Sequence, residues 1–304
     1  NNHLNNRMMR TANFKSAAIA ALLSMGLLTG CTNGITNQKT SNHMDTLNLT
    51  QEWDKKFPQS NKVNHRKVTF RNRYGITLAA DLYEPKNIES KVPAIAVSGP
   101  FGAVKEQSSG LYAQTMAERG FLTLAFDPSY TGESGGEPRN VASPDINTED
   151  FSAAVDFLIA HPNVDAKRIG IIGICGFGGM GLNAAAMDTR IKATVASTMY
   201  DMSRVNANGY FDAEDSAEVR RNKREAMNAI RTRDAQNGTA TPGTPGLPTS
   251  IKGDEPQFVK DYFDYYKTER AFHARAINSN GAWNPTMALS FINMPLLTYI
   301  HEID

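Results

Sequence analysis

The sequence predicts an α/β protein: a mostly parallel, doubly wound sheet with helices on both faces and an inserted helical lid. One observation is that strand-like and helix-like segments alternate through the middle of the chain. Another is that these strand-like segments are continuous apolar runs, which is typical of parallel strands buried on both sides. The predicted strands are residues 92–99, 121–127, 168–175 and 192–197, and the predicted helices are residues 109–119, 150–160 and 178–187.

Composition sets broad limits on function. The 304 residues include 32 Lys and Arg and 31 Asp and Glu, with a net charge of +1 and 40% hydrophobic residues, which suits a large core with a lid. The basic residues are scattered, so no nucleic-acid surface is predicted. No metal-ligand spacing such as His-x-x-x-His or Cys-x-x-Cys occurs, and the sequence predicts neither a metal nor a cofactor.

The N-terminal segment has the pattern of an export signal. Arg7, Arg10 and Lys15 precede the apolar residues 17–28, which are too few to span a bilayer. The segment ends in Leu-Thr-Gly-Cys at Cys31, which resembles the bacterial lipoprotein signal. That resemblance implies cleavage, a lipid on Cys31 and anchoring in the bacterial cell envelope on the periplasmic side. The alternative is a secretory signal with an accidental cysteine.

The next segments lead into the sheet. Residues 32–62 are polar and predict a tether followed by an irregular lead-in. Residues 65–72 and 76–85 are strand-like and flank a turn, so they predict an antiparallel pair.

Residues 168–181, RIGIIGICGFGGMG, centre on Cys175. An apolar strand ends in a glycine-rich turn that leads into a helix-compatible segment, which is the pattern of a nucleophile elbow. The amides at the start of the helix are expected to favour thiolate over thiol. If Cys31 is lipidated or removed, Cys175 has no disulfide partner within the chain. The alternative is a small buried apolar side chain.

Three motifs in chain order, SGPFG, FDPSYTGESGG and GICGFGG, resemble the α/β-hydrolase superfamily in its dienelactone-hydrolase and YcjY-like polyketide-transferase branch. The resemblance covers residues 62–197. It implies the α/β-hydrolase fold, a small-molecule acyl substrate and Cys175 as the nucleophile. Phe177 departs from this pattern because a small residue is usual there, so we expect Gly178 and Gly179 to provide clearance.

The loop after residues 92–97 is predicted to form part of an oxyanion hole. In an elbow-type hydrolase this loop supplies one amide, and the residue after the nucleophile supplies the other. Pro100 has no amide hydrogen, so the candidates are the backbone N–H groups of Phe101 and Gly176. The alternative for Phe101 is an ordinary strand-to-helix turn. Asp127 follows another strand and is expected to cap its turn rather than act as the catalytic acid.

The resemblance also implies an acid and a histidine after the nucleophile. Only His273 and His301 follow Cys175; His273 is expected in the core or an interface and His301 at the surface, so neither is proposed as the base. Residues 294–304 resemble the helix that precedes the acid-bearing strand. On the family pattern we therefore expect a truncated or degenerate chain that lacks the acid and the base and is inactive as it stands.

Between residues 198 and 293 the strand–helix alternation stops, which predicts a lid. Residues 214–235 predict a solvated charged helix, and residues 237–248 a loop. Several aromatic residues could line an apolar pocket over Cys175 or could simply pack the lid. They are Tyr262, Phe263, Tyr265, Tyr266, Phe272 and Trp283.

Together these patterns predict an exported, lipid-anchored hydrolase that acts on an ester, lactone or thioester through Cys175. Two alternatives stay open: a non-catalytic binding lipoprotein with the same fold, and a thiol redox protein, which would lack a resolving cysteine. The predicted parts are a signal peptide (1–31), a tether and lead-in (32–62), the core (63–198), the lid (199–293) and the start of a C-terminal core segment (294–304).

Overall fold

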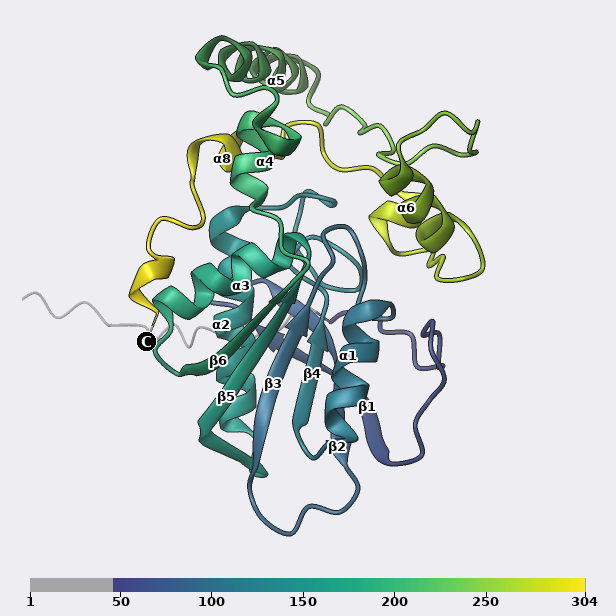
Figure 1. Ribbon diagram of the computed structural model, residues 1–304, viewed down its shortest axis with the longest axis vertical. Helices are drawn as coiled ribbons and strands as arrows, with labels where there is room; N and C mark the ends of the chain where they lie inside the picture. The colour runs from purple at the N-terminus through teal and green to yellow at the C-terminus, as the bar shows by residue number, and fades with distance from the viewer. Residues whose placement is uncertain (1–45, 304) are drawn as a thin grey trace, which may run out of the picture. The chain divides into compact units, whose positions relative to one another are not determined.

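The computed structural model describes residues 46–303. The predicted signal peptide, Cys31 and the first part of the tether lie outside these residues, so export and lipid anchoring stay predictions. Six strands form one sheet in the order β1-β2-β4-β3-β5-β6 (Figure 1). They are β1 (Val63–Arg71), β2 (Thr77–Pro85), β3 (Val92–Ser98), β4 (Leu122–Phe126), β5 (Val164–Ile174) and β6 (Ile191–Ser197).

Strand directions match the predicted sheet. β1 pairs antiparallel with β2, as the turn between them predicts, and β2 pairs antiparallel with β4. The remaining neighbours, β3 with β4, β3 with β5, and β5 with β6, are parallel. Every residue of β4 is buried, in agreement with its continuous apolar sequence.

Helices cover both faces of the sheet, which confirms the predicted doubly wound arrangement. α1 (Ser108–Ala117) contacts β2, β3 and β4, whereas α2 (Pro144–Ala160) and α3 (Gly176–Met187) contact β5 and each other. Ile171 belongs to one apolar core and Ile172 to the other, because successive side chains of a strand point to opposite faces.

α2 begins six residues before the predicted start at Asp150, at Pro144. The hydroxyl of Ser143 accepts a hydrogen bond from Ile146 N–H, and Pro144 occupies the first helical turn, where its missing amide hydrogen costs nothing. A cap followed by proline was therefore the signal for the true start.

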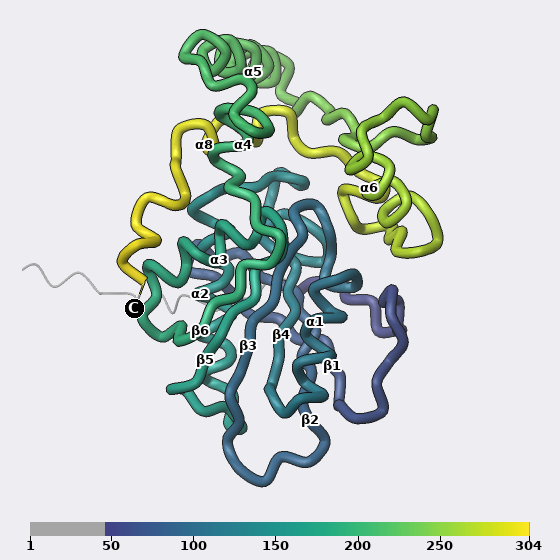
Figure 2. Tube along the Cα trace, viewed as in Figure 1, coloured from purple at the N-terminus to yellow at the C-terminus, as the bar shows by residue number. Residues whose placement is uncertain are grey.

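The lid follows β6, and the chain then returns through α8 to a position beside α3, where η2 contacts that helix (Figure 2). No helix within residues 46–303 has the length and apolar character needed to cross a membrane. The lid elements are α4 (Met202–Asn208), the 3-10 turn η1 (Tyr210–Asp212), α5 (Ala217–Asn237), α6 (Gln257–Lys267), α7 (Ile277–Asn280), α8 (Ala288–Asn293) and the 3-10 turn η2 (Ile300–Glu302).

α5 is the charged helix predicted from the sequence. Its only buried residue is Met227, and Arg221 pairs with Glu225 one turn later at 2.8 Å, so the predicted solvated helix is confirmed.

The prediction of a helix over residues 294–304 is wrong. α8 ends at Asn293, and Pro295 disfavours helical geometry in the residue before it. Only the short turn η2 follows among the described residues.

Candidate active site

Cys175 lies between the end of β5 and the start of α3, in the turn that the sequence predicts. Its backbone has φ 57° and ψ −125°, a left-handed conformation that is strained for a residue with a side chain. The Cys175 amide donates to Ser197 O at 2.9 Å, and Cys175 O accepts from Gly178 N–H at 2.9 Å and from Tyr200 N–H at 3.1 Å. These three bonds hold the strained turn against the end of β6.

Phe177 fits into the turn for a different reason than predicted. The ring is buried, and a Cβ on Gly173 would lie 2.2 Å from Phe177 O, while a Cβ on Gly99 would lie 2.9 Å from Phe177 Cβ. Gly178 and Gly179 instead give room to the chain after β6. The clearance for Phe177 therefore comes from the ends of β3 and β5 rather than from its own helix.

The two amides predicted to form an oxyanion hole lie together at Cys175. The backbone N–H groups of Gly176 and Phe101 both lie near the Cys175 thiol and lower its pKa, although they come from different loops. The approach of these loops requires a glycine, because a Cβ on Gly176 would lie 2.9 Å from Phe101 Cβ. Two amides directed at one point beside a nucleophile are the arrangement that stabilises an oxyanion.

The electrostatic expectation for Cys175 is corrected. Burial raises the pKa of its thiol, and the hydrogen bonds from Gly176 and Phe101 N–H offset only part of this shift. The start of the helix favours the thiolate, but desolvation of the sulfur outweighs this effect. The protonated thiol is therefore the main form at neutral pH.

We expect the alkylation midpoint of Cys175 to lie above about pH 8.5, the value of an unperturbed thiol. Only the thiolate reacts, so a raised pKa leaves less reactive form at every pH below the midpoint. Iodoacetamide rates from about pH 6 to about pH 10, followed by intact mass in a Cys31→Ser background with glutathione as reference, give the midpoint. A midpoint below that of glutathione would contradict this expectation.

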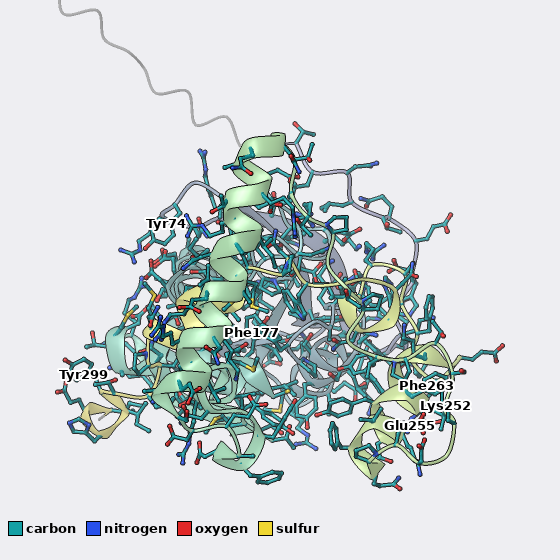
Figure 3. The ribbon with its side chains drawn as sticks, turned by 90° about the horizontal axis from the view of Figure 1, so that it is seen from above. Tyr74, Phe177, Lys252, Glu255, Phe263 and Tyr299 are labelled. Atoms are coloured by element: carbon teal, nitrogen blue, oxygen red, sulfur yellow. The ribbon has the colours of Figure 1, made fainter. Side chains whose placement is uncertain are left out.

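Cys175 lines a pocket of about 750 Å³ between the sheet and the lid. Of the six aromatic residues predicted to line it, three do and three do not, and Phe263 lies toward the edge of the lid in Figure 3. The lining residues are Pro100, Phe101, Cys175, Thr198, Tyr200, Met202, Val205, Tyr210, Gly246, Leu247, Phe258, Val259, Tyr262, Tyr266, Ile277, Asn278 and Trp283.

The segment after β6 contributes pocket residues that the sequence analysis missed. Thr198, Tyr200 and Met202 follow the carboxyl end of this parallel strand, the edge where such sheets form their sites, so position alone could have identified them. Burial and the neighbouring Tyr200 side chain raise the pKa of Tyr262, so its hydroxyl stays protonated.

None of the four histidines within residues 46–303 lines this pocket. His273 is buried and its Nε2 lies 3.6 Å from Asp54 Oδ2, which confirms the predicted core position. His301 is exposed, as predicted.

Comparison with known proteins identifies the family of this chain. Residues 74–289 match the family described as X-Pro dipeptidyl-peptidase (S15 family). The chain belongs to this S15 family. Solved α/β hydrolases share its fold, among them GrgF from Penicillium with a TM-score of 0.61 at 21% identity over 79% of this chain and 77% of GrgF. The α/β-hydrolase fold predicted from the motifs is thus confirmed.

Two bacterial proteins are similar to this S15-family chain over most of its length. Uncharacterized protein PA2218 of Pseudomonas aeruginosa is 59% identical, with 99% of this chain and 81% of that protein covered. Its crystal structure gives a TM-score of 0.82 over 85% of this chain and 80% of that chain. Uncharacterized protein YcjY of Escherichia coli is 38% identical over 70% of each protein. The thiohydrolase aneE of Aspergillus aculeatus is 33% identical over 43% of this chain and 41% of that enzyme.

A buried ion network supports the Phe101 loop of this S15-family chain. The Lys105 ammonium lies within 2.8 Å of a carboxylate oxygen of each of Glu106, Asp127 and Glu133. Three carboxylates this close together could hold a metal ion, but here the ammonium lies among them. No pattern in the sequence predicts this network.

Asp127 has the structural role that the sequence predicts. Its carboxylate accepts hydrogen bonds from the backbone N–H groups of Lys105 at 2.8 Å and Glu133 at 2.9 Å. It thereby joins the Phe101 loop to the loop after β4.

Proposed function

We propose that this S15-family chain transfers acyl groups through Cys175 and hydrolyses a neutral ester, lactone or thioester. The observation that carries the proposal is the convergence of the Phe101 and Gly176 amides on a thiol that lines a pocket of about 750 Å³. That volume is within the usual range for small-molecule sites.

The proposed reaction has two stages. The Cys175 thiol loses its proton to solvent, and the thiolate attacks the substrate carbonyl carbon, so that a carbon–sulfur bond forms and the carbonyl π electrons move to oxygen. The Phe101 and Gly176 amides donate to this oxyanion. Its collapse expels the alcohol or thiol, which takes a proton from solvent, and leaves a thioester on Cys175. Water hydrolyses this thioester slowly, because the described residues that line the pocket offer no general base, so low turnover remains the expectation for this chain.

The residues of the pocket wall favour a substrate with a neutral acyl group over an X-Pro peptide. None of the described residues that line it is Asp, Glu, Lys, Arg or His. An X-Pro substrate carries a free α-ammonium group, and burying that charge without a carboxylate partner is costly. The apolar wall and the tyrosine hydroxyls fit an uncharged acyl chain instead.

A matched pair of esters tests this proposal. We expect p-nitrophenyl hexanoate to acylate Cys175, because its leaving group departs without a proton and the pocket offers no acid. The 6-aminohexanoate ester has the same chain length but a terminal ammonium, so it should react at least about 100-fold more slowly. Intact mass follows the adduct and absorbance follows p-nitrophenolate. Equal rates for the two esters, or hydrolysis of Gly-Pro p-nitroanilide, would argue for a charged substrate.

One observation favours a second candidate, a binding protein of the cell envelope that keeps the fold without turnover. The pocket-lining residues within 46–303 include no histidine or carboxylate that could act as a general base at neutral pH. In that case p-nitrophenyl hexanoate would displace an apolar dye from the pocket and leave no adduct on Cys175.

A further inference from the structure

The short lid helix α7 holds the loop that carries the Phe101 amide. Asn278 Nδ2 donates to Phe101 O at 2.8 Å, and the Asn278 backbone N–H donates to Gly102 O at 3.1 Å. One lid residue thus holds two successive carbonyl groups of the loop.

The peptide unit on the other side of Phe101 is held as well. Ala103 N–H donates to Pro100 O at 3.0 Å, and Pro100 O belongs to the same peptide unit as the Phe101 N–H that points at Cys175. Since peptide units are planar, fixing a carbonyl on each side of Phe101 fixes the direction of its N–H.

The loop is shaped to receive the Asn278 side chain. Gly102 has φ +84°, and a Cβ there would lie 2.4 Å from Asn278 Oδ1. The Asn278 side chain also lies beside the hydroxyl of Tyr266 and lowers its pKa against the effect of burial, and both residues line the pocket. The Phe101 ring stacks on Trp283, another lid residue, at a centroid distance of 4.4 Å.

We propose that Asn278 is a positioning residue that aims the Phe101 amide at the nucleophile and couples lid placement to oxyanion stabilisation. The inference rests on the proposed function of Cys175. Asn278 also lines the pocket, but in this proposal it acts through Phe101. A lid that moved away would remove the hydrogen bond to Phe101 O and release one of the two oxyanion donors.

Asn278→Ala should raise the alkylation midpoint of Cys175 by about one pH unit, the shift expected when a thiolate loses a charge-assisted hydrogen bond. The maximal rate of acylation by p-nitrophenyl hexanoate should fall by about 10-fold or more, because an oxyanion donor is misdirected, with the half-saturating ester concentration little changed. Asn278→Ser, whose hydroxyl is too short to reach Phe101 O, provides a second variant with a smaller change in polarity and should show the same shifts.

Asn280→Ala is the matched control, because Asn280 is an exposed residue of the same type on the same helix. It should leave both the midpoint and the acylation rate unchanged. A purely structural role for Asn278 would lower the melting temperature without moving the midpoint, and that result in either folded Asn278 variant would overturn the proposal. Failure of the wild-type protein to form the adduct would instead refute the proposed function.

Discussion

Replacing Cys175 with alanine is expected to abolish the covalent adduct formed with p-nitrophenyl hexanoate. Cys175 is the residue at the centre of the turn, and its thiol lies beside the two amides that are proposed to bind the oxyanion. Alanine removes the sulfur but keeps a Cβ, so the left-handed backbone at φ 57° carries the same steric cost as in the wild type. The fold should therefore survive while the nucleophile is lost.

Cys175→Ser should form the adduct at a rate lower by about 100-fold or more, because a hydroxyl without an adjacent base is weakly nucleophilic at its free pKa. Among the described residues that line the pocket, none is a histidine or carboxylate that could take the proton. This variant separates the need for sulfur from the need for a polar atom at that position.

Cys31→Ser provides the matched control, since Cys31 and Cys175 are the two cysteines of the sequence. It should keep the full adduct, with the acyl group on the peptide that contains Cys175. An adduct that persists in Cys175→Ala, or that maps to another residue, would show that the acyl group is not carried by Cys175.

The elbow could be predicted because its constraints lie within one short segment. A Cβ on Gly173 would collide with the backbone of Phe177, four residues later, so the fold requires a glycine at a fixed spacing from Cys175. A requirement of this kind is visible in the sequence without any knowledge of distant contacts.

The pocket wall could be predicted only in part. Tyr262 and Tyr266 lie four residues apart on α6 and face the pocket together, whereas Phe263 and Tyr265 do not line it. Residues four apart lie on the same face of a helix, which explains the difference. The sequence predicted an aromatic segment there but no helix. Asn278 was missed because its role depends on a contact with Phe101, 177 residues earlier in the chain.

The buried ion network could not be predicted from the sequence. Lys105 and Glu106 are adjacent charged residues, a pattern that is usually exposed. Their burial depends on partners such as Asp127 and Glu133, which lie 22 and 28 residues from Lys105, and on Arg275 in the lid, 2.8 Å from Glu106. No local pattern signals a set of charges that is paired only after folding.

Replacing Lys105 with methionine is expected to destabilise the fold by about 3–5 kcal/mol, the usual cost of removing one partner from a buried ion pair. The Lys105 side chain is fully buried and lies 2.7 Å from Glu106, 2.8 Å from Asp127 and 2.7 Å from Glu133. Methionine fills a similar volume without charge. The variant therefore leaves buried carboxylates short of one cation and creates little empty space.

The pH dependence of this defect follows from Glu133. Burial alone raises the pKa of the Glu133 carboxyl, but the Lys105 charge and hydrogen bonds from Lys105 and Lys67 lower it to about 2. In the wild type the ionised Glu133 carboxylate therefore stabilises the fold above the unfolded pKa of about 4.3. This stabilisation is lost as the pH falls toward 2. Without Lys105 the pKa of Glu133 in the folded protein rises, because burial is then opposed by fewer positive charges. A folded-state pKa above the unfolded value makes the variant lose further stability as the pH rises above about 4.3.

Urea unfolding followed by circular dichroism at about pH 5 and about pH 8 measures this difference. Lys167→Met, at an exposed position of β5, is the control and should change the free energy of unfolding by no more than about 0.5 kcal/mol. The Lys105→Met defect should be larger at the higher pH, because the carboxylates are then fully ionised. A defect of equal size at both pH values would contradict the explanation that the lost stability comes from unpaired, ionised carboxylates.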